Sequence, residues 1–140
     1  MSDEEFINAF ESGTLCNQEF HHADHVRMGF LYLCRFPVLE AVRRFAETLQ
    51  RFAAANGKPG LYHETITWAF LFLIRERMAH LLEETGRQPN WTEFAAANPD
   101  LLDWKNNILK RYYLDETLAS DLARKVFLLP DQKSPRLSPE

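Results

Sequence analysis

A chain of 140 residues is long enough to bury a hydrophobic core as one domain, and its formal net charge of -4 disfavours nucleic acid as a partner. Apolar residues make up 46% of it and aromatic residues 13%, which excludes an intrinsically disordered protein. The longest strongly apolar run, residues 68–74, is far shorter than the roughly 20 residues that span a bilayer, and the acidic start has no secretory signal. We expect a cytoplasmic protein with no membrane partner, one domain over residues 1–129 and a flexible tail over 130–140.

Apolar residues recur with helical spacing along the whole chain, and no segment alternates as a half-buried strand does. The sequence therefore predicts an all-α fold, a helical bundle. Asn17 is the expected N-cap of the second helix. Between Gly, Pro and Asn punctuation, the expected helices cover residues 3–11, 18–35, 37–55, 61–84, one or two turns from Asn90 or Thr92, then 100–113 and 115–127.

The helix expected over residues 61–84 differs from the others in its apolar pattern. From Ile66 to Ile74 only Thr67 interrupts the apolar residues, so nearly every side of this helix is apolar. Such a helix is buried, and we expect it at the centre of the bundle. On the second helix, Gly29 borders the expected buried stripe and would let a neighbouring helix approach closely. The residues of that stripe are Ala23, Val26, Phe30, Leu33 and Cys34.

Two cysteines, Cys16 and Cys34, lack the CxxC spacing of a metal or redox site. Free thiols in a reducing cytoplasm are expected, because disulfides belong to oxidising compartments. Cys34 is expected to be a small core residue.

Four of the five histidines lie in two clusters, Phe20-His21-His22-Ala23-Asp24-His25 and Tyr62-His63-Glu64-Thr65, and each cluster opens an expected helix. Short connections make consecutive helices antiparallel, so the second and fourth helices run parallel. Their N-terminal ends then meet at one end of the bundle. A count of about 100° per residue selects His22, His25 and His63 over His21 and His80 for a shared site.

Histidines at a helix N-terminus feel the positive end of the helix dipole, which disfavours the protonated ring. Neutral imidazole is the form that a metal ligand or a general base requires. The sequence therefore predicts that His22, His25 and His63 bind a divalent metal ion, whose identity stays open, or share acid–base work. Glu64 would be a fourth ligand or a base. Metal-bound and metal-free sites both stay open, because no HExxH motif and no EXXH pair is present.

Three residues close to the expected histidine site, or on the same helix, complete the predicted set. Glu64, Tyr62 and Arg75 are expected to act in catalysis, with Tyr62 and Arg75 orienting or neutralising a substrate. The competing hypothesis is a non-catalytic module that binds a small-molecule ligand or a protein partner, including a second copy of the chain. In that module the histidines only cap and hydrogen-bond the helix ends.

Three segments together resemble a family of small bacterial helical proteins to which no activity is attached. They are FHHADHVR at residues 20–27, YHETIT at 62–67 and NPDLL at 98–102. The resemblance extends to about Asp131. It implies a bacterial, cytoplasmic protein, and it assigns no role to any residue.

Overall fold

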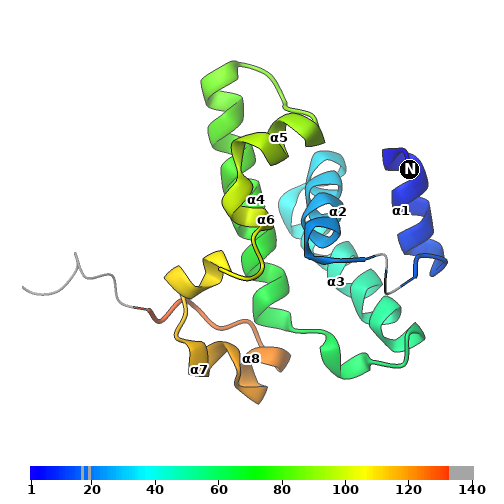
Figure 1. Cartoon of the computed structure of the whole chain (residues 1–140), viewed down its shortest axis with the longest axis vertical. Helices are drawn as coiled ribbons and strands as arrows, with labels where there is room; N and C mark the ends of the chain where they lie inside the picture. The colour runs from blue at the N-terminus through cyan, green and yellow to red at the C-terminus, as the bar shows by residue number, and fades with distance from the viewer. Residues whose placement is uncertain (17, 19, 133–140) are drawn as a thin grey trace, which may run out of the picture.

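The structure is a computed structural model that describes residues 1–16, 18 and 20–132, and every regular element in this part of the chain is helical (Figure 1). The predicted all-α fold is confirmed. No helix among these residues combines the length and the hydropathy that crossing a bilayer requires. The elements are α1 (Asp3–Ser12), α2 (His22–Arg35), α3 (Val38–Ala55), η2 (Pro59–Leu61), α4 (Glu64–Thr85), α5 (Trp91–Ala97), α6 (Pro99–Leu102), η3 (Ile108–Arg111), α7 (Asp115–Leu118) and α8 (Asp121–Lys125).

Helices α2 and α4 run in the same direction, and α3 runs antiparallel to both (Figure 1). This is the arrangement that the short connections predicted. Helix α4 contacts α2, α3, η3 and α8, and helix α2 contacts α1, α3, α4, α5 and α6, so these two helices share the centre of the bundle. The buried residues of α4 lie on several of its sides, as the nearly continuous apolar run from Ile66 to Ile74 predicted.

At Gly29, helix α2 packs directly against side chains of α4. A Cβ atom at Gly29 would lie 2.9 Å from Cδ2 of Leu71 and 3.2 Å from Cδ1 of Ile74. Carbon atoms in van der Waals contact are about 3.5–4.0 Å apart, so the missing side chain is what lets the two helices approach closely. The prediction for Gly29 is thereby confirmed.

Two helices begin later than predicted. Helix α2 starts at His22 because the backbone of His21 is extended (φ -87, ψ 178), and the Asp24 carboxylate accepts its N–H at 3.0 Å. Asn17, the expected cap, lies outside the described residues. Helix α4 starts at Glu64 because the preceding residues form the separate turn η2 and His63 becomes the N-cap.

The long helices predicted over residues 100–113 and 115–127 are wrong. The first is split into α6 and η3, and the second into α7 and α8. Side chains that hydrogen-bond nearby backbone N–H groups cause these breaks, because such bonds compete with the continuous helix. Asp103 accepts the N–H three residues on at 3.1 Å, Asn107 accepts the N–H two residues on at 2.9 Å, and Ser120 caps α8 at 3.1 Å.

The buried face of α2 is broader than predicted and is shifted along the helix. Met28, Leu31 and Tyr32 are buried because α1 and α3 cover a second side of α2. The predicted burial of Ala23 and Cys34 is wrong, since both are exposed, one in the first turn and the other in the last. Cys16 is exposed as well, and both cysteines are free thiols.

Two polar anchors attach the C-terminal elements to α4. Arg77 makes a bidentate pair with Asp100, with nitrogen–oxygen distances of 3.0 and 2.8 Å, and thereby holds α6. The fully buried Thr65 donates its hydroxyl to the carbonyl of Val126 at 2.8 Å and accepts the N–H of Leu128 at 3.1 Å. These anchors place backbone carbonyls of the C-terminal segment beside both histidine clusters.

Candidate functional site

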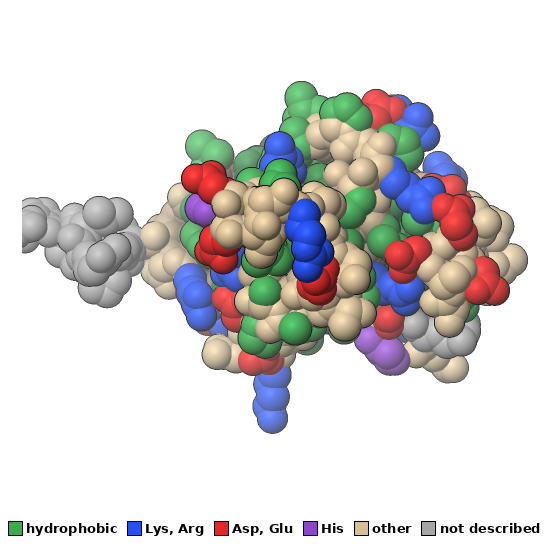
Figure 2. Space-filling model, turned by 90° about the horizontal axis from the view of Figure 1, so that it is seen from above, with side chains coloured by type: hydrophobic (Ala, Val, Ile, Leu, Met, Phe, Trp, Pro, Cys, Tyr) green, Lys and Arg blue, Asp and Glu red, His purple; other side chains and the backbone are tan. Residues whose placement is uncertain are grey.

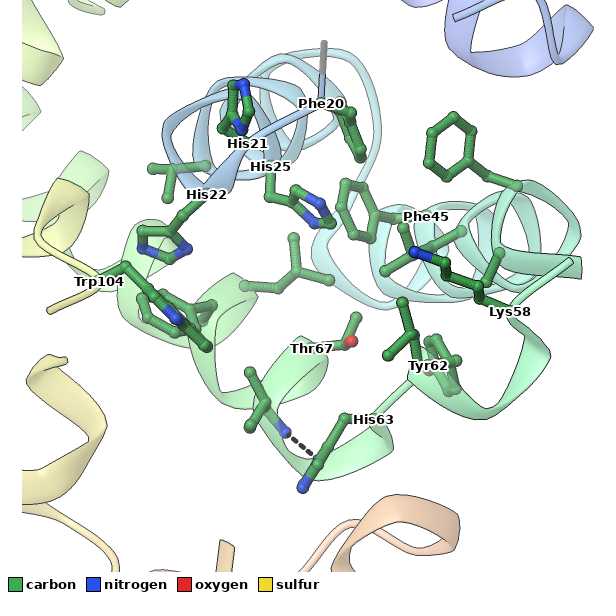
Figure 3. A pocket seen from close by; sticks show the side chains of 18 of the residues that line it. Phe20, His21, His22, His25, Phe45, Lys58, Tyr62, His63, Thr67 and Trp104 are labelled. Atoms are coloured by element: carbon green, nitrogen blue, oxygen red, sulfur yellow. Dashed lines mark hydrogen bonds between the residues drawn. The ribbon is translucent and has the colours of Figure 1, made fainter. Parts of the chain in front are cut away.

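A pocket of about 660 Å³ lies between the N-terminal ends of α2 and α4 and the C-terminal half of α3 (Figure 3). Leu71 and Ile74, the two residues that pack against Gly29, are among its lining residues. His21, His22, His25 and His63 all line the pocket, so the two histidine clusters lie at one site. Its walls are mainly apolar and include Phe20, Phe45, Leu49, Phe52, Phe70 and Trp104.

His63 caps α4 and has both ring nitrogens hydrogen-bonded. Its Nδ1 accepts the N–H of Ile66 at 3.1 Å, the bond dashed in Figure 3. Its Nε2 lies 2.8 Å from the carbonyl oxygen of Leu118. Because a carbonyl only accepts, Nε2 carries the proton. Burial lowers the pKa of His63, and the charge of Arg124 lowers it further, whereas the Leu118 carbonyl opposes both. The ring is neutral and works as a helix cap.

His22 uses one ring nitrogen for structure. Its Nε2 donates to the carbonyl of Leu101 at 2.9 Å, a contact that depends on the position of α6. The ring lies 4.9 Å from the ring of Phe70 and 4.9 Å from that of Trp104, measured between centroids. Burial lowers the pKa of His22, and the Leu101 carbonyl and the charge of Asp103 oppose that shift. The neutral ring therefore keeps Nδ1 as an acceptor.

His25 is directed toward the middle of the pocket (Figure 3). Its ring lies 4.0 Å from that of Phe20. Burial lowers the pKa of His25 to about 4, with the nearby His22 as the next cause, while the backbone of Phe20 opposes the shift. At pH 7 this residue is therefore a neutral imidazole in mostly apolar surroundings, able to donate or accept one hydrogen bond to a molecule in the pocket.

The two histidines that the angular count left out have different positions. His21 lines the pocket, although it is exposed, because it precedes α2 at the pocket edge. The exposed His80 lies farther along α4, 4.0 Å from Glu76, and does not line the pocket. The count therefore missed His21 because it treated that residue as part of the helix.

Of the three predicted catalytic residues, the structure brings Tyr62 and Glu64 together and leaves Arg75 apart. Tyr62 lines the pocket, but its hydroxyl donates to the Glu64 carboxylate at 2.5 Å. Burial raises the pKa of Tyr62, and Glu64 raises it further. Neither Glu64 nor Arg75 lines the pocket, and Arg75 is exposed on α4, three turns from Glu64.

The predicted metal ligands have little free coordinating capacity. Across the described ranges, no group of three or more His, Cys, Asp or Glu side chains is placed to hold a metal ion. His63 would have to give up a backbone hydrogen bond to become a ligand, and His22 has only Nδ1 left. A metal at His22, His25 and His63 stays a prediction from the sequence.

Three further pocket residues were not predicted. Trp104 is 52% exposed and forms a wall beside His22. Lys58 comes from the connection between α3 and α4, and Arg124 comes from α8, where its Nη1 donates to the carbonyl of Gly60 at 2.6 Å. Only Lys58 carried a local signal, as the one basic residue in the turn before the second histidine cluster.

Comparison with known proteins finds no match to this chain among family models, curated proteins or solved structures. The resemblance to small bacterial helical proteins therefore stays a prediction. The geometry of the pocket is the basis for a functional conclusion.

Proposed function

We propose that this protein binds an apolar small molecule in the pocket between α2, α3 and α4, as a non-catalytic binding protein. The observation that carries the proposal is a pocket of about 660 Å³ with mostly apolar walls and four histidines of two distant clusters on its surface. Small-molecule sites are typically concave and apolar, of roughly 300–1,000 Å³, with a few polar groups that orient the ligand.

The aromatic walls would supply most of the affinity. Phe45 and Phe52 line the pocket from α3, Phe70 lines it from α4, and Phe20 lines it from the segment that precedes α2. Aromatic rings bury large apolar areas and favour offset or edge-to-face contacts with another ring. Against these walls, the neutral ring of His25 would orient one polar atom of the ligand by a hydrogen bond.

The hydrogen bonds of the other candidates favour binding over acid–base catalysis. His63 is occupied by Ile66 and Leu118, and Glu64 is held by the hydroxyl of Tyr62. A catalytic imidazole needs a partner that orients it and a reacting group within reach. No described residue that lines the pocket supplies a carboxylate for this purpose.

Fluorescence titration with 1-aminoanthracene, a neutral apolar probe, tests the proposal. We expect saturable binding to the wild-type protein at one site. Ala53 is buried and lines the pocket, so Ala53→Trp should fill it and weaken binding at least tenfold. Ala54→Trp, at the next and exposed position of α3, is the matched control and should bind normally. Circular dichroism would establish that both variants are folded. Equal binding by the two variants would contradict the proposal.

We also propose that the protein is located in the cytoplasm of a bacterium. Cys16 and Cys34 are exposed free thiols, which suits the reducing cytoplasm of a bacterium. Cell fractionation of the native host would test this assignment.

A further inference from the structure

The side chains with a full charge that line the described part of the pocket are all cationic. They are Lys58 and Arg124, and no aspartate or glutamate is among these lining residues. The chain as a whole has the opposite balance, with 20 acidic and 16 basic residues. On the face seen in Figure 2, acidic and basic side chains are interspersed. The pocket therefore differs from the rest of the molecule in the sign of its charge.

Both cations belong to one side of the pocket. Arg124 donates to the carbonyl of Gly60, two residues after Lys58, so its guanidinium is held beside the turn that carries Lys58. Figure 3 shows the Lys58 side chain extending from this turn over the pocket. A guanidinium has five N–H donors, and the bond to Gly60 uses one of them. Donors therefore remain for an anionic group.

Neither cation forms a salt bridge with a described residue, although the pKa of Asp121 is lowered by its hydrogen bond with Lys125 and further by the charge of Arg124. The salt bridges among the described residues involve other basic side chains, for example Arg27 with Asp3 and Lys125 with Asp121. On α8 the nearest acidic residue, Asp121, is paired with Lys125. Two cations beside an apolar cavity attract an anion, since low-dielectric walls strengthen the electrostatic potential within a cleft.

Resting on the proposed function, we infer that the ligand is an anionic amphiphile. Its apolar part occupies the pocket among Phe45, Phe52 and Phe70, and its carboxylate lies at Lys58 and Arg124. His22, His25 and His63, whose pKa values are lowered by burial, add no competing charge, and His25 faces the apolar part of the ligand.

A displacement experiment with two ligands that have the same number of carbon atoms tests this inference. Dodecanoate and dodecanol would compete with bound 1-aminoanthracene at pH 7.5, and we expect dodecanoate to bind about tenfold more tightly. Lys58→Gln should reduce the preference for dodecanoate about fivefold, which corresponds to the largest stabilisation usual for an exposed ion pair. The same variant should bind dodecanol with unchanged affinity. Lys110→Gln removes the same charge from an exposed residue outside the pocket and should change neither ligand.

Variants at Arg124 separate charge from structure. Arg124→Gln should reduce the preference for dodecanoate, and Arg124→Lys, which keeps the charge, should restore most of it. Three outcomes would overturn the inference and leave the pocket proposal standing. They are equal binding of the two ligands, equal effects of Lys58→Gln and Lys110→Gln, and failure of both ligands to displace a bound probe. Absence of probe binding would instead refute the proposed function itself.

Discussion

Gly29 of α2 lies so close to Leu71 of α4 that a Cβ atom on the glycine would be 2.9 Å from the leucine Cδ2. This contact borders the pocket, because Leu71 also lines the cavity. Toward their N-terminal ends the same two helices meet again through the rings of His22 and Phe70, which lie 4.9 Å apart and line the cavity as well. The missing side chain at Gly29 thus sets the spacing of the two helices that border the pocket.

Replacing Gly29 with leucine should lower the free energy of unfolding by about 1–3 kcal/mol, the usual cost of overpacking a core. The added side chain has no space between α2 and the side chains of Leu71 and Ile74. Urea denaturation measures the change. Ala23→Leu, at an exposed position of the same helix, should stay within about 0.5 kcal/mol of the wild type. Equal costs at the two positions would contradict the close contact at Gly29.

Thr65→Val should destabilise the protein by about 2–3 kcal/mol. Valine matches threonine in shape but removes the donor to the carbonyl of Val126 and the acceptor for the N–H of Leu128. Both backbone groups would then lose their partner next to a fully buried side chain. Thermal unfolding of this variant and of Thr65→Ser provides the comparison. The serine keeps the hydroxyl and should retain more stability, and an equal loss in both would point to packing as the cause.

Stability should decrease as the pH falls from about 6.5 toward 4. Burial lowers the pKa of His25 to about 4 and also lowers the pKa values of His22 and His63. Below the ordinary histidine pKa of 6.5 the unfolded chain binds protons that the folded chain excludes. The contribution is therefore complete above pH 6.5. For His25 it is lost on passing to about pH 4, with a full extent on the order of 3 kcal/mol.

His25→Gln should weaken this pH dependence, because it removes the group with the largest shift. Denaturant unfolding at several pH values between 4 and 7 would give the slope of the unfolding free energy. His80→Gln, at an exposed position on α4, serves as the control and should keep the wild-type slope. A slope that is the same in all three proteins would exclude His25 as its source.

Elemental analysis of protein purified without a histidine tag tests the predicted metal ligands. We expect His63→Ala to leave the metal content unchanged and to lower the melting temperature. Both ring nitrogens of His63 are hydrogen-bonded, one to the N–H of Ile66 and the other to the carbonyl of Leu118. One equivalent of metal in the wild type that disappears in His63→Ala would instead establish His63 as a ligand. His80→Ala controls for metal held by an exposed histidine.

Local pattern and short connections were sufficient to predict the core of the fold. The apolar run around Thr67 predicted that α4 is buried on several sides, and the turns at Pro37 and Gly57 predicted that α2 and α4 are parallel. Helical periodicity indicates which side of a helix is buried, and a short loop makes the next helix antiparallel to the one before it. For the same reasons the sequence alone placed the two histidine clusters at one end of the bundle.

Only the tertiary structure decided which hydrogen bonds each side chain of the pocket makes. His22 bonds a carbonyl 79 residues away, His63 one 55 residues away, and Arg124 one 64 residues away. One member of each pair, Leu101, Leu118 or Arg124, belongs to a short C-terminal segment, where side-chain bonds to the backbone override the helical pattern. Periodicity identifies the face on which a histidine lies. Whether its ring nitrogens are free for a ligand depends on which distant carbonyl folds against it.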